Sequence, residues 1–74
     1  MVVASGFVEA AGKNNIDAIV KEMERRSMDV SDIVTDKAFF LFRRETIDAM
    51  KEEVEFLRRI ENVRNVHLTY YSIE

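Results

Sequence analysis

Apolar and polar residues alternate along residues 2–9 and again along residues 63–74. The first segment, VVASGFVE, is rich in β-branched residues, and the second, VRNVHLTYYSIE, carries valine, leucine and isoleucine between polar positions. A period of two places successive side chains on opposite faces of a strand. Both segments are therefore predicted to be strands, and residues 63–74 are expected to complete a sheet rather than to form a frayed tail.

Two further segments carry apolar residues at the spacing of an amphipathic helix. The first contains Asn14 and Asp17, which have the spacing of an N-cap and the third helical residue. Its apolar positions are Ile16, Ile19, Val20 and Met23. The second follows Thr46, the expected N-cap, and either Asn62 or Asn65 is expected to close it. Its apolar positions are Ile47, Met50, Val54, Leu57 and Ile60.

Two apolar runs, MDVSDIVT at residues 28–35 and AFFLFR at residues 38–43, lie between the helices. A two-residue turn at Asp36-Lys37 would join them as a hairpin. The expected cross-strand pairs are Val34 with Phe39, Ile33 with Phe40 and Asp32 with Leu41. The segment FFLF is apolar on both faces, which favours a central strand.

The order is therefore strand, helix, strand, strand, helix, strand. With right-handed crossovers, two interleaved strand–helix–strand units give a ferredoxin-like split βαβ fold of the α+β class. This fold places both helices on one face of a four-stranded antiparallel sheet. Residues 1–74 are predicted to form this single domain, with the first and third strands central and residues 63–74 at the edge beside the first.

The other face of this sheet is expected to be open. Alternation along residues 2–9 turns Val3 and Phe7 toward the open face and Gly6 toward a helix. A glycine within a strand is costly unless another group packs closely over it. In the final strand, the residues expected on the open face are His67, Thr69 and Tyr71.

Two facing assignments fit the hairpin. The preferred assignment points Val34, Phe39 and Leu41 toward the helices. It points toward the open face Ile33, Phe40 and Phe42. The inverse assignment exposes Phe39 in place of the other aromatic pair, so an aromatic side chain reaches the open face in either case. A monomer seldom leaves an apolar surface of this size in water, and we therefore predict a binding face.

Composition narrows the class of function. The net charge of −3 argues against nucleic acid, because phosphate recognition needs a basic surface. The absence of cysteine excludes disulfides and thiolate metal sites. No apolar run approaches the roughly 18 to 20 residues of a membrane span. Residues 1–5 lack the basic region of a signal peptide, so we expect a cytoplasmic protein without membrane insertion.

No residues in the sequence have the spacing of a catalytic or metal site. The single histidine, His67, lies in an alternating strand, where a surface role is common. Gly6 and Gly12 lack the spacing of a phosphate-binding loop. A hydrolase of the acylphosphatase type would need an arginine in the loop that contains Asn14 and Asn15, and no arginine lies there. We therefore expect no enzymatic activity, no cofactor and no metal.

Two observations each leave two interpretations. Asp29 and Asp32 flank the predicted edge strand, where they either keep other strands from pairing or anchor a basic partner. The aromatic open face either binds such a partner or seals a weak homodimer.

The stretch LRRIENVRNVHLTYYSIE resembles the end of NapD-type chaperones, in which a helix leads through a short segment into a final strand. Here the apolar positions of that segment are Val63, Val66, Leu68 and Tyr70. VSDIVTDKAFFLFRRET resembles the second hairpin of the family, and VASGFVEA resembles its first strand. The resemblance covers nearly the whole chain and consists of hydrophobic patterns rather than a catalytic signature.

This resemblance implies a cytoplasmic assembly chaperone of a periplasmic molybdenum-containing nitrate reductase. Such chaperones bind the twin-arginine signal peptide of the catalytic subunit and delay export until the cofactor is loaded. Carboxylates of Asp29, Asp32 or Glu9 would then pair with the two arginines. An apolar helix lying on the sheet would cover Phe7 and Phe40. The expected peptide-binding residues are Phe7, Glu9, Asp29, Asp32, Ile33, Phe40, Phe42, His67 and Tyr71.

The alternative is a ligand-sensing or oligomerisation module of the ACT or Lrp-regulator type. Those modules share the ferredoxin-like outline and pair their sheets or edges into dimers. This sequence lacks a glycine-rich ligand loop between its first strand and first helix. The chaperone is therefore the preferred interpretation.

Overall fold

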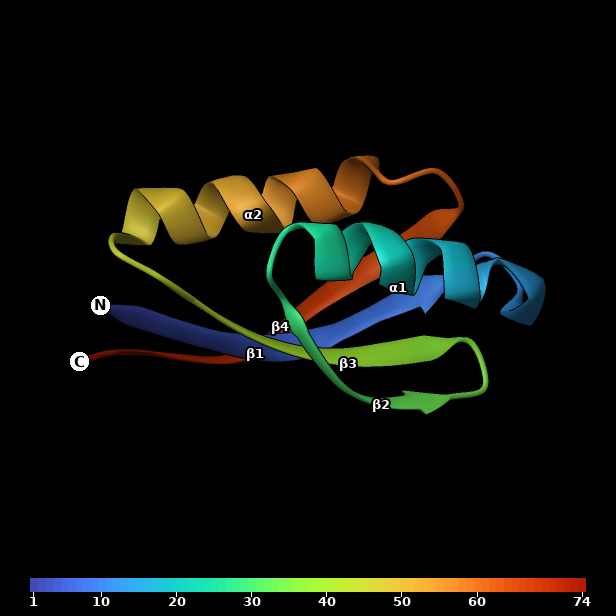
Figure 1. Cartoon of the computed structure of the whole chain (residues 1–74), viewed down its shortest axis with the longest axis horizontal. Helices are drawn as coiled ribbons and strands as arrows, with labels where there is room; N and C mark the ends of the chain where they lie inside the picture. The colour runs from blue at the N-terminus through green and yellow to red at the C-terminus, as the bar shows by residue number, and fades with distance from the viewer.

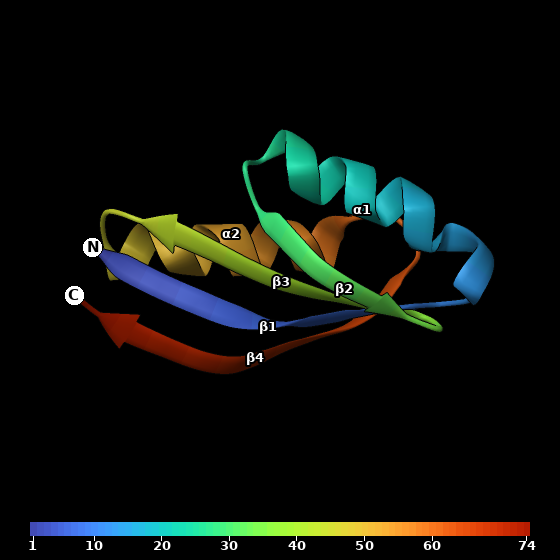
Figure 2. The same ribbon diagram turned by 60° about the horizontal axis from the view of Figure 1, so that its bottom comes forward.

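The computed structural model describes residues 1–74 except for the side chain of Lys13. Its elements are β1 (Val2–Ala10), a 3₁₀ turn (Lys13–Asn15), α1 (Ile16–Arg25), β2 (Asp29–Val34), β3 (Lys37–Arg44), α2 (Ile47–Arg59) and β4 (Val63–Ile73). The strands form one antiparallel sheet in the order β2-β3-β1-β4, and both helices lie on the same side of it (Figure 1). The predicted ferredoxin-like fold is confirmed, with β1 and β3 central and β4 at the edge (Figure 2).

Of the two predicted helix N-caps, one agrees with the structure and one does not. The Thr46 hydroxyl accepts a hydrogen bond from the Ala49 amide at 3.1 Å, so Thr46 caps α2 as predicted. The N-cap of α1 is Asn15 rather than Asn14, because the preceding residues form a 3₁₀ turn, and its side chain makes no capping hydrogen bond. Asn62, in the left-handed region with φ of 71°, turns the chain from α2 into β4.

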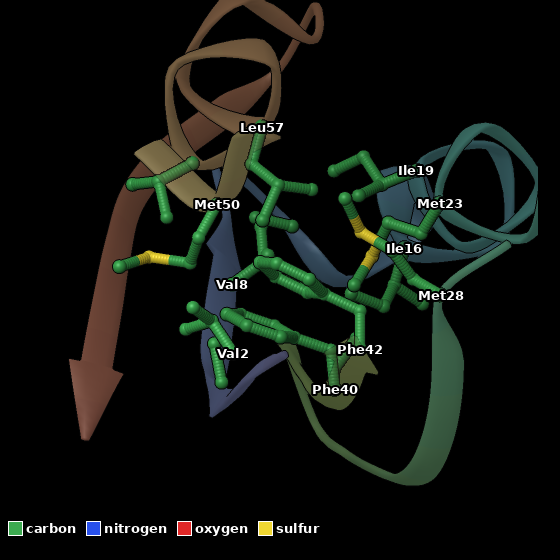
Figure 3. Close-up of a cluster of buried hydrophobic side chains, with 14 residues drawn as sticks. Val2, Val8, Ile16, Ile19, Met23, Met28, Phe40, Phe42, Met50 and Leu57 are labelled. Carbon is green, nitrogen blue, oxygen red and sulfur yellow. The ribbon is translucent and has the colours of Figure 1, made fainter. Parts of the chain in front are cut away.

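The core fills the space between the helices and the sheet. The Phe40 and Phe42 rings rise from β3 into this space with their centroids 5.7 Å apart (Figure 3). The other large, fully buried side chains are Val8 from β1, Ile19 and Met23 from α1, and Leu57 from α2. Because the rings pack against both helices, β3 connects the two halves of the core.

The placement of Phe40 and Phe42 corrects the predicted facing of the hairpin. The turn is Thr35-Asp36, not Asp36-Lys37, and Thr35 adopts a left-handed φ of 57°. The observed pairs are Val34 with Lys37, Ile33 with Ala38, Asp32 with Phe39, Val30 with Phe40 and Asp29 with Leu41. Moving the turn by one residue changes each cross-strand pair by two residues, which keeps every side chain on its face. The facing follows instead from the pairing of β3 with β1, in which Phe40 and Phe42 stand opposite the inward-facing Gly6 and Ala4. Ala38, Phe40 and Phe42 therefore face the helices, whereas Phe39 and Leu41 face outward.

A bulge in β4 corrects a second facing prediction. Ser5 pairs with Tyr70 and Gly6 pairs with Leu68, so Thr69 is the extra residue. The Thr69 hydroxyl donates to the Ser5 carbonyl at 3.1 Å. Beyond the bulge, Tyr70 joins the open face, and Tyr71, paired with Ala4, lies on the helix side instead.

One buried carboxylate joins three elements at one end of the core. Glu53 of α2 accepts hydrogen bonds from Arg26, which follows α1, and from Arg44 of β3, whose Nη2 lies 2.8 Å from Glu53 Oε2. Arg44 also donates to the Arg26 carbonyl at 2.6 Å. Burial alone would raise the pKa of the Glu53 carboxyl, but the hydrogen bonds from Arg26 and Arg44 outweigh it and hold that pKa below its ordinary value.

Neither α1 nor α2, the two α-helices among the described residues, is long and apolar enough to cross a membrane.

Candidate functional site

The face of the sheet opposite the helices, called the open face below, receives side chains from all four strands. Pairing between the strands assigns its members, because opposed residues point the same way. Its apolar and aromatic members are Val3, Phe7, Val34, Phe39, Leu41, His67 and Tyr70. Apolar and aromatic side chains from all four strands therefore share this one face.

Three rings at the centre of this face form an aromatic cluster of Phe7, Phe39 and His67. Phe7 on β1 stacks on His67 of β4, with centroids 4.6 Å apart and ring planes inclined by 21°. On its other side Phe7 meets Phe39 of β3 at 5.4 Å and 45°. The rings of Phe7 and Phe39 are half-buried and His67 is exposed, so the cluster presents contiguous ring surface across three strands.

Charges border the aromatic cluster on two sides. Lys37 lies 6.0 Å from the Phe7 ring centroid and 4.0 Å from a Glu9 carboxylate oxygen. Glu9 is thus already partnered. On β2, the exposed side chains of Asp32 and Asp29 stand opposite Phe39 and Leu41. Two carboxylates therefore lie directly beside the apolar surface.

Asp29 and Asp32 differ from Glu9 in their partners. Asp32 Oδ1 accepts a hydrogen bond from the Ile33 amide at 2.9 Å, which orients the carboxylate. Among the side chains that the structure describes, none makes an ion pair with Asp29 or Asp32. These two carboxylates are consequently the anionic groups of the open face that an added cation would meet.

The predicted site residues are only partly brought together. The residues that do share the open face are Phe7, Glu9, Asp29, Asp32 and His67. Phe40 and Phe42 are only 2% and 1% exposed in the core, so their prediction as peptide-binding residues is wrong. Ile33, opposite Ala38, and Tyr71 lie on the helix side of the sheet, which contradicts their predicted facing as well.

The preferred sequence assignment missed four apolar or aromatic members of the open face, Val34, Phe39, Leu41 and Tyr70. The inverse hairpin assignment contained the signal for Phe39, since it exposes that residue in place of Phe40 and Phe42. The pleat alone gave no sign of Tyr70, because the bulge at Thr69 changes which of two adjacent tyrosines faces outward.

The open face combines aromatic ring surface with bordering carboxylates. Among the described side chains, no three histidine, cysteine, aspartate or glutamate residues gather as metal ligands would. Ring surface and bordering carboxylates suit a ligand that is apolar in one part and cationic in another. Comparison of the chain with family models, with characterised proteins and with solved structures gave no match.

Proposed function

We propose that this protein is a cytoplasmic chaperone that binds the twin-arginine signal peptide of a periplasmic molybdoenzyme precursor. The preferred client is the catalytic subunit of a nitrate reductase, whose export the chaperone delays until the cofactor is loaded. One observation carries the proposal: the aromatic cluster lies beside Asp29 and Asp32 on the open face.

The apolar segment of the peptide would lie on the aromatic cluster of the open face. A signal peptide follows its arginines with an apolar segment, and this segment can fold as a helix with one face against the sheet. Phe7, Phe39 and Leu41 form a continuous apolar row on neighbouring strands where such a helix would lie. Burying this row removes apolar surface from water at about 25 cal/mol per Å², so it would supply the part of the affinity that salt does not weaken.

The two arginines of the peptide would bind along the edge strand β2. A guanidinium is a planar fork that matches a carboxylate with two parallel hydrogen bonds, whereas an ammonium group is a point charge. Asp32, oriented by the Ile33 amide, and Asp29, three residues earlier on the same edge strand, offer one carboxylate to each arginine. This arrangement favours twin arginine over twin lysine.

Isothermal titration with a twin-arginine signal peptide and its twin-lysine form tests the proposal. Twin lysine should bind more weakly by about 1 to 2 kcal/mol, within the range for a charge-assisted contact. Asp32→Asn should cost a similar amount, and the two changes should not add fully, because both weaken the same contact between Asp32 and an arginine. Glu24→Gln, at an exposed acidic position on α1, is the matched control and should leave binding unchanged.

Salt separates the two parts of the interaction. Added salt should remove the arginine contribution and leave the apolar contribution, because screening acts on exposed charges and not on apolar burial. Absence of heat with both peptides at high micromolar concentration, together with clear binding of a free amino acid, would reject the chaperone in favour of a ligand-sensing module.

A further inference from the structure

The two edges of the sheet differ in how well they are protected from pairing. β2 has six residues, one bulge at Ser31, and exposed carboxylates at Asp29 and Asp32, all of which discourage another strand. β4 has eleven residues and, despite its bulges, carries no aspartate, glutamate, lysine or arginine from Asn65 to Ile73. The β4 edge is therefore the one that lacks protecting charges.

Exposed apolar side chains gather along the same edge. Leu68, Tyr71 and Ile73 are 38%, 52% and 65% exposed, although all three point to the helix side of the sheet. Between β4 and α2 runs a groove of about 590 Å³, called the α2–β4 groove. Its apolar and aromatic lining consists of Ile47, Met50, Val54, Leu68 and Tyr71. This surface is separate from the open face, because it lies on the opposite side of the sheet.

The outer rim of the α2–β4 groove carries charges in an alternating order. Asp48, Lys51, Glu55 and Arg58 follow one another at spacings of three, four and three residues, which places them along one stripe of the helix. All four are exposed, and Arg58 donates to Glu55 at 3.0 Å. The stripe reads negative, positive, negative, positive along the chain.

This alternating stripe is complementary to itself when it runs in the opposite direction. Two antiparallel copies of α2 whose charged stripes are centred on each other midway between Lys51 and Glu55 place Lys51 opposite the partner's Glu55 and Asp48 opposite the partner's Arg58. All four pairs across such an interface are of opposite charge. A two-fold axis generates this reciprocity, since each contact occurs twice in an isologous dimer.

We infer that a second copy of this chain covers the α2–β4 groove, in a two-fold dimer whose β4 edges and α2 stripes run antiparallel. The axis is perpendicular to the sheet, so both α2 helices lie on one side and both open faces lie on the other. The dimer buries Leu68, Tyr71 and Ile73 and leaves the aromatic cluster free. It is consequently independent of the proposed peptide binding.

Sedimentation velocity of the full chain at low ionic strength, from low micromolar to near-millimolar concentration, tests this inference. The wild-type protein should shift from monomer to dimer. Lys51→Glu places like charges opposite the partner's Glu55 twice in each dimer, and it should raise the dissociation constant roughly tenfold or more. Glu55→Lys should have a similar effect. The double variant K51E/E55K inverts both charges and should restore the wild-type constant.

Two further variants distinguish this interface from a general effect of charge or folding. K21E/E24K makes the same exchange on exposed positions of α1 and should leave the dissociation constant unchanged. Tyr71→Asp, at a half-exposed position in the α2–β4 groove, should keep the circular dichroism spectrum and weaken dimerisation. A wild-type chain that stays monomeric throughout the range overturns the inference. So does a double variant that dimerises no better than the two single variants.

Discussion

The Gly6 backbone lies so close to the His67 carbonyl group that a Cβ atom on Gly6 would stand 1.9 Å from the carbonyl oxygen. It would also lie 3.0 Å from the His67 carbonyl carbon and 3.1 Å from the Leu68 Cα. The expected partner of this inward-facing glycine was a helix, whereas the structure brings the backbone of β4 against it at the bulge. The lack of a side chain at Gly6 therefore allows β1 and β4 to approach each other closely.

Gly6→Ala should displace β4 from β1 and destabilise the protein by about 1 to 3 kcal/mol, the usual cost of an overpacked site. Backbone atoms cannot swing aside as the end of a flexible side chain can. Gly12→Ala is the matched control, because the nearest atom to its Cβ is the side-chain nitrogen Nδ2 of Asn15 at 3.8 Å, an ordinary contact. Chemical denaturation of both variants measures the difference, and equal midpoints would contradict the close approach.

Adjacent phenylalanines on β3 should respond in opposite ways to a charge. Phe39→Asp should keep the fold, because Phe39 is half-buried on the open face, and it should abolish most peptide binding by breaking the aromatic cluster. Phe40→Asp should unfold the chain, because it buries a carboxylate in the apolar core. Circular dichroism reports folding and isothermal titration reports binding. A folded Phe40→Asp variant would contradict the burial of Phe40 between the sheet and the helices.

Leu57 is fully buried on the apolar face of α2 (Figure 3). Leu57→Ala should cost roughly 2 to 5 kcal/mol of unfolding free energy, because it leaves a cavity above the sheet. Val20→Ala on α1, a half-buried position beside the core, should cost less than half as much. Denaturant titration gives both values, and an unchanged midpoint for the Leu57 variant would show that the stripe is not core.

Ionisation of Glu53 should make the free energy of unfolding depend on pH in the acidic range. Its pKa in the folded protein lies below the ordinary 4.5, so the folded state favours the ionised carboxylate. The stabilisation is fully present above the unfolded pKa and is lost as the pH falls through the lower folded pKa. Glu53→Gln should therefore be less stable than wild type at neutral pH, and the difference should shrink below about pH 4.5.

Thermal or denaturant unfolding from neutral to strongly acidic pH measures this dependence. Glu24→Gln, an exposed position on α1, should follow the wild-type profile throughout. A constant difference between wild type and Glu53→Gln at all pH values would mean that ionisation of Glu53 does not stabilise the fold.

Sequence periodicity predicted the elements, their order and the central position of β3, because each depends on a pattern repeated over many residues. The apolar stripe from Met50 to Leu57 lies in the core as expected. Facing in β3 was wrong because alternation shows which residues share a face but not which face meets the helices, and the segment FFLF is apolar on both faces.

Errors in facing also changed which residues were predicted for the candidate site. Phe7 and His67 were correctly placed because β1 is regular and because His67 precedes the bulge in β4. Tyr71 was misplaced because it follows that bulge. The sequence does not distinguish Glu53 from the other glutamates of α2, because its two arginine partners lie 27 and 9 residues away in the chain.

The bulge at Thr69 also gives the protein a pair of optical reporters. The chain has no tryptophan, and its only two tyrosines are the adjacent residues Tyr70 and Tyr71. Because the bulge sends Tyr70 to the open face and Tyr71 to the α2–β4 groove, Y71F leaves a protein whose intrinsic fluorescence senses one surface, and Y70F leaves one that senses the other. Peptide addition and protein concentration can thus be followed separately, without any attached dye, by two positions that are neighbours in the chain.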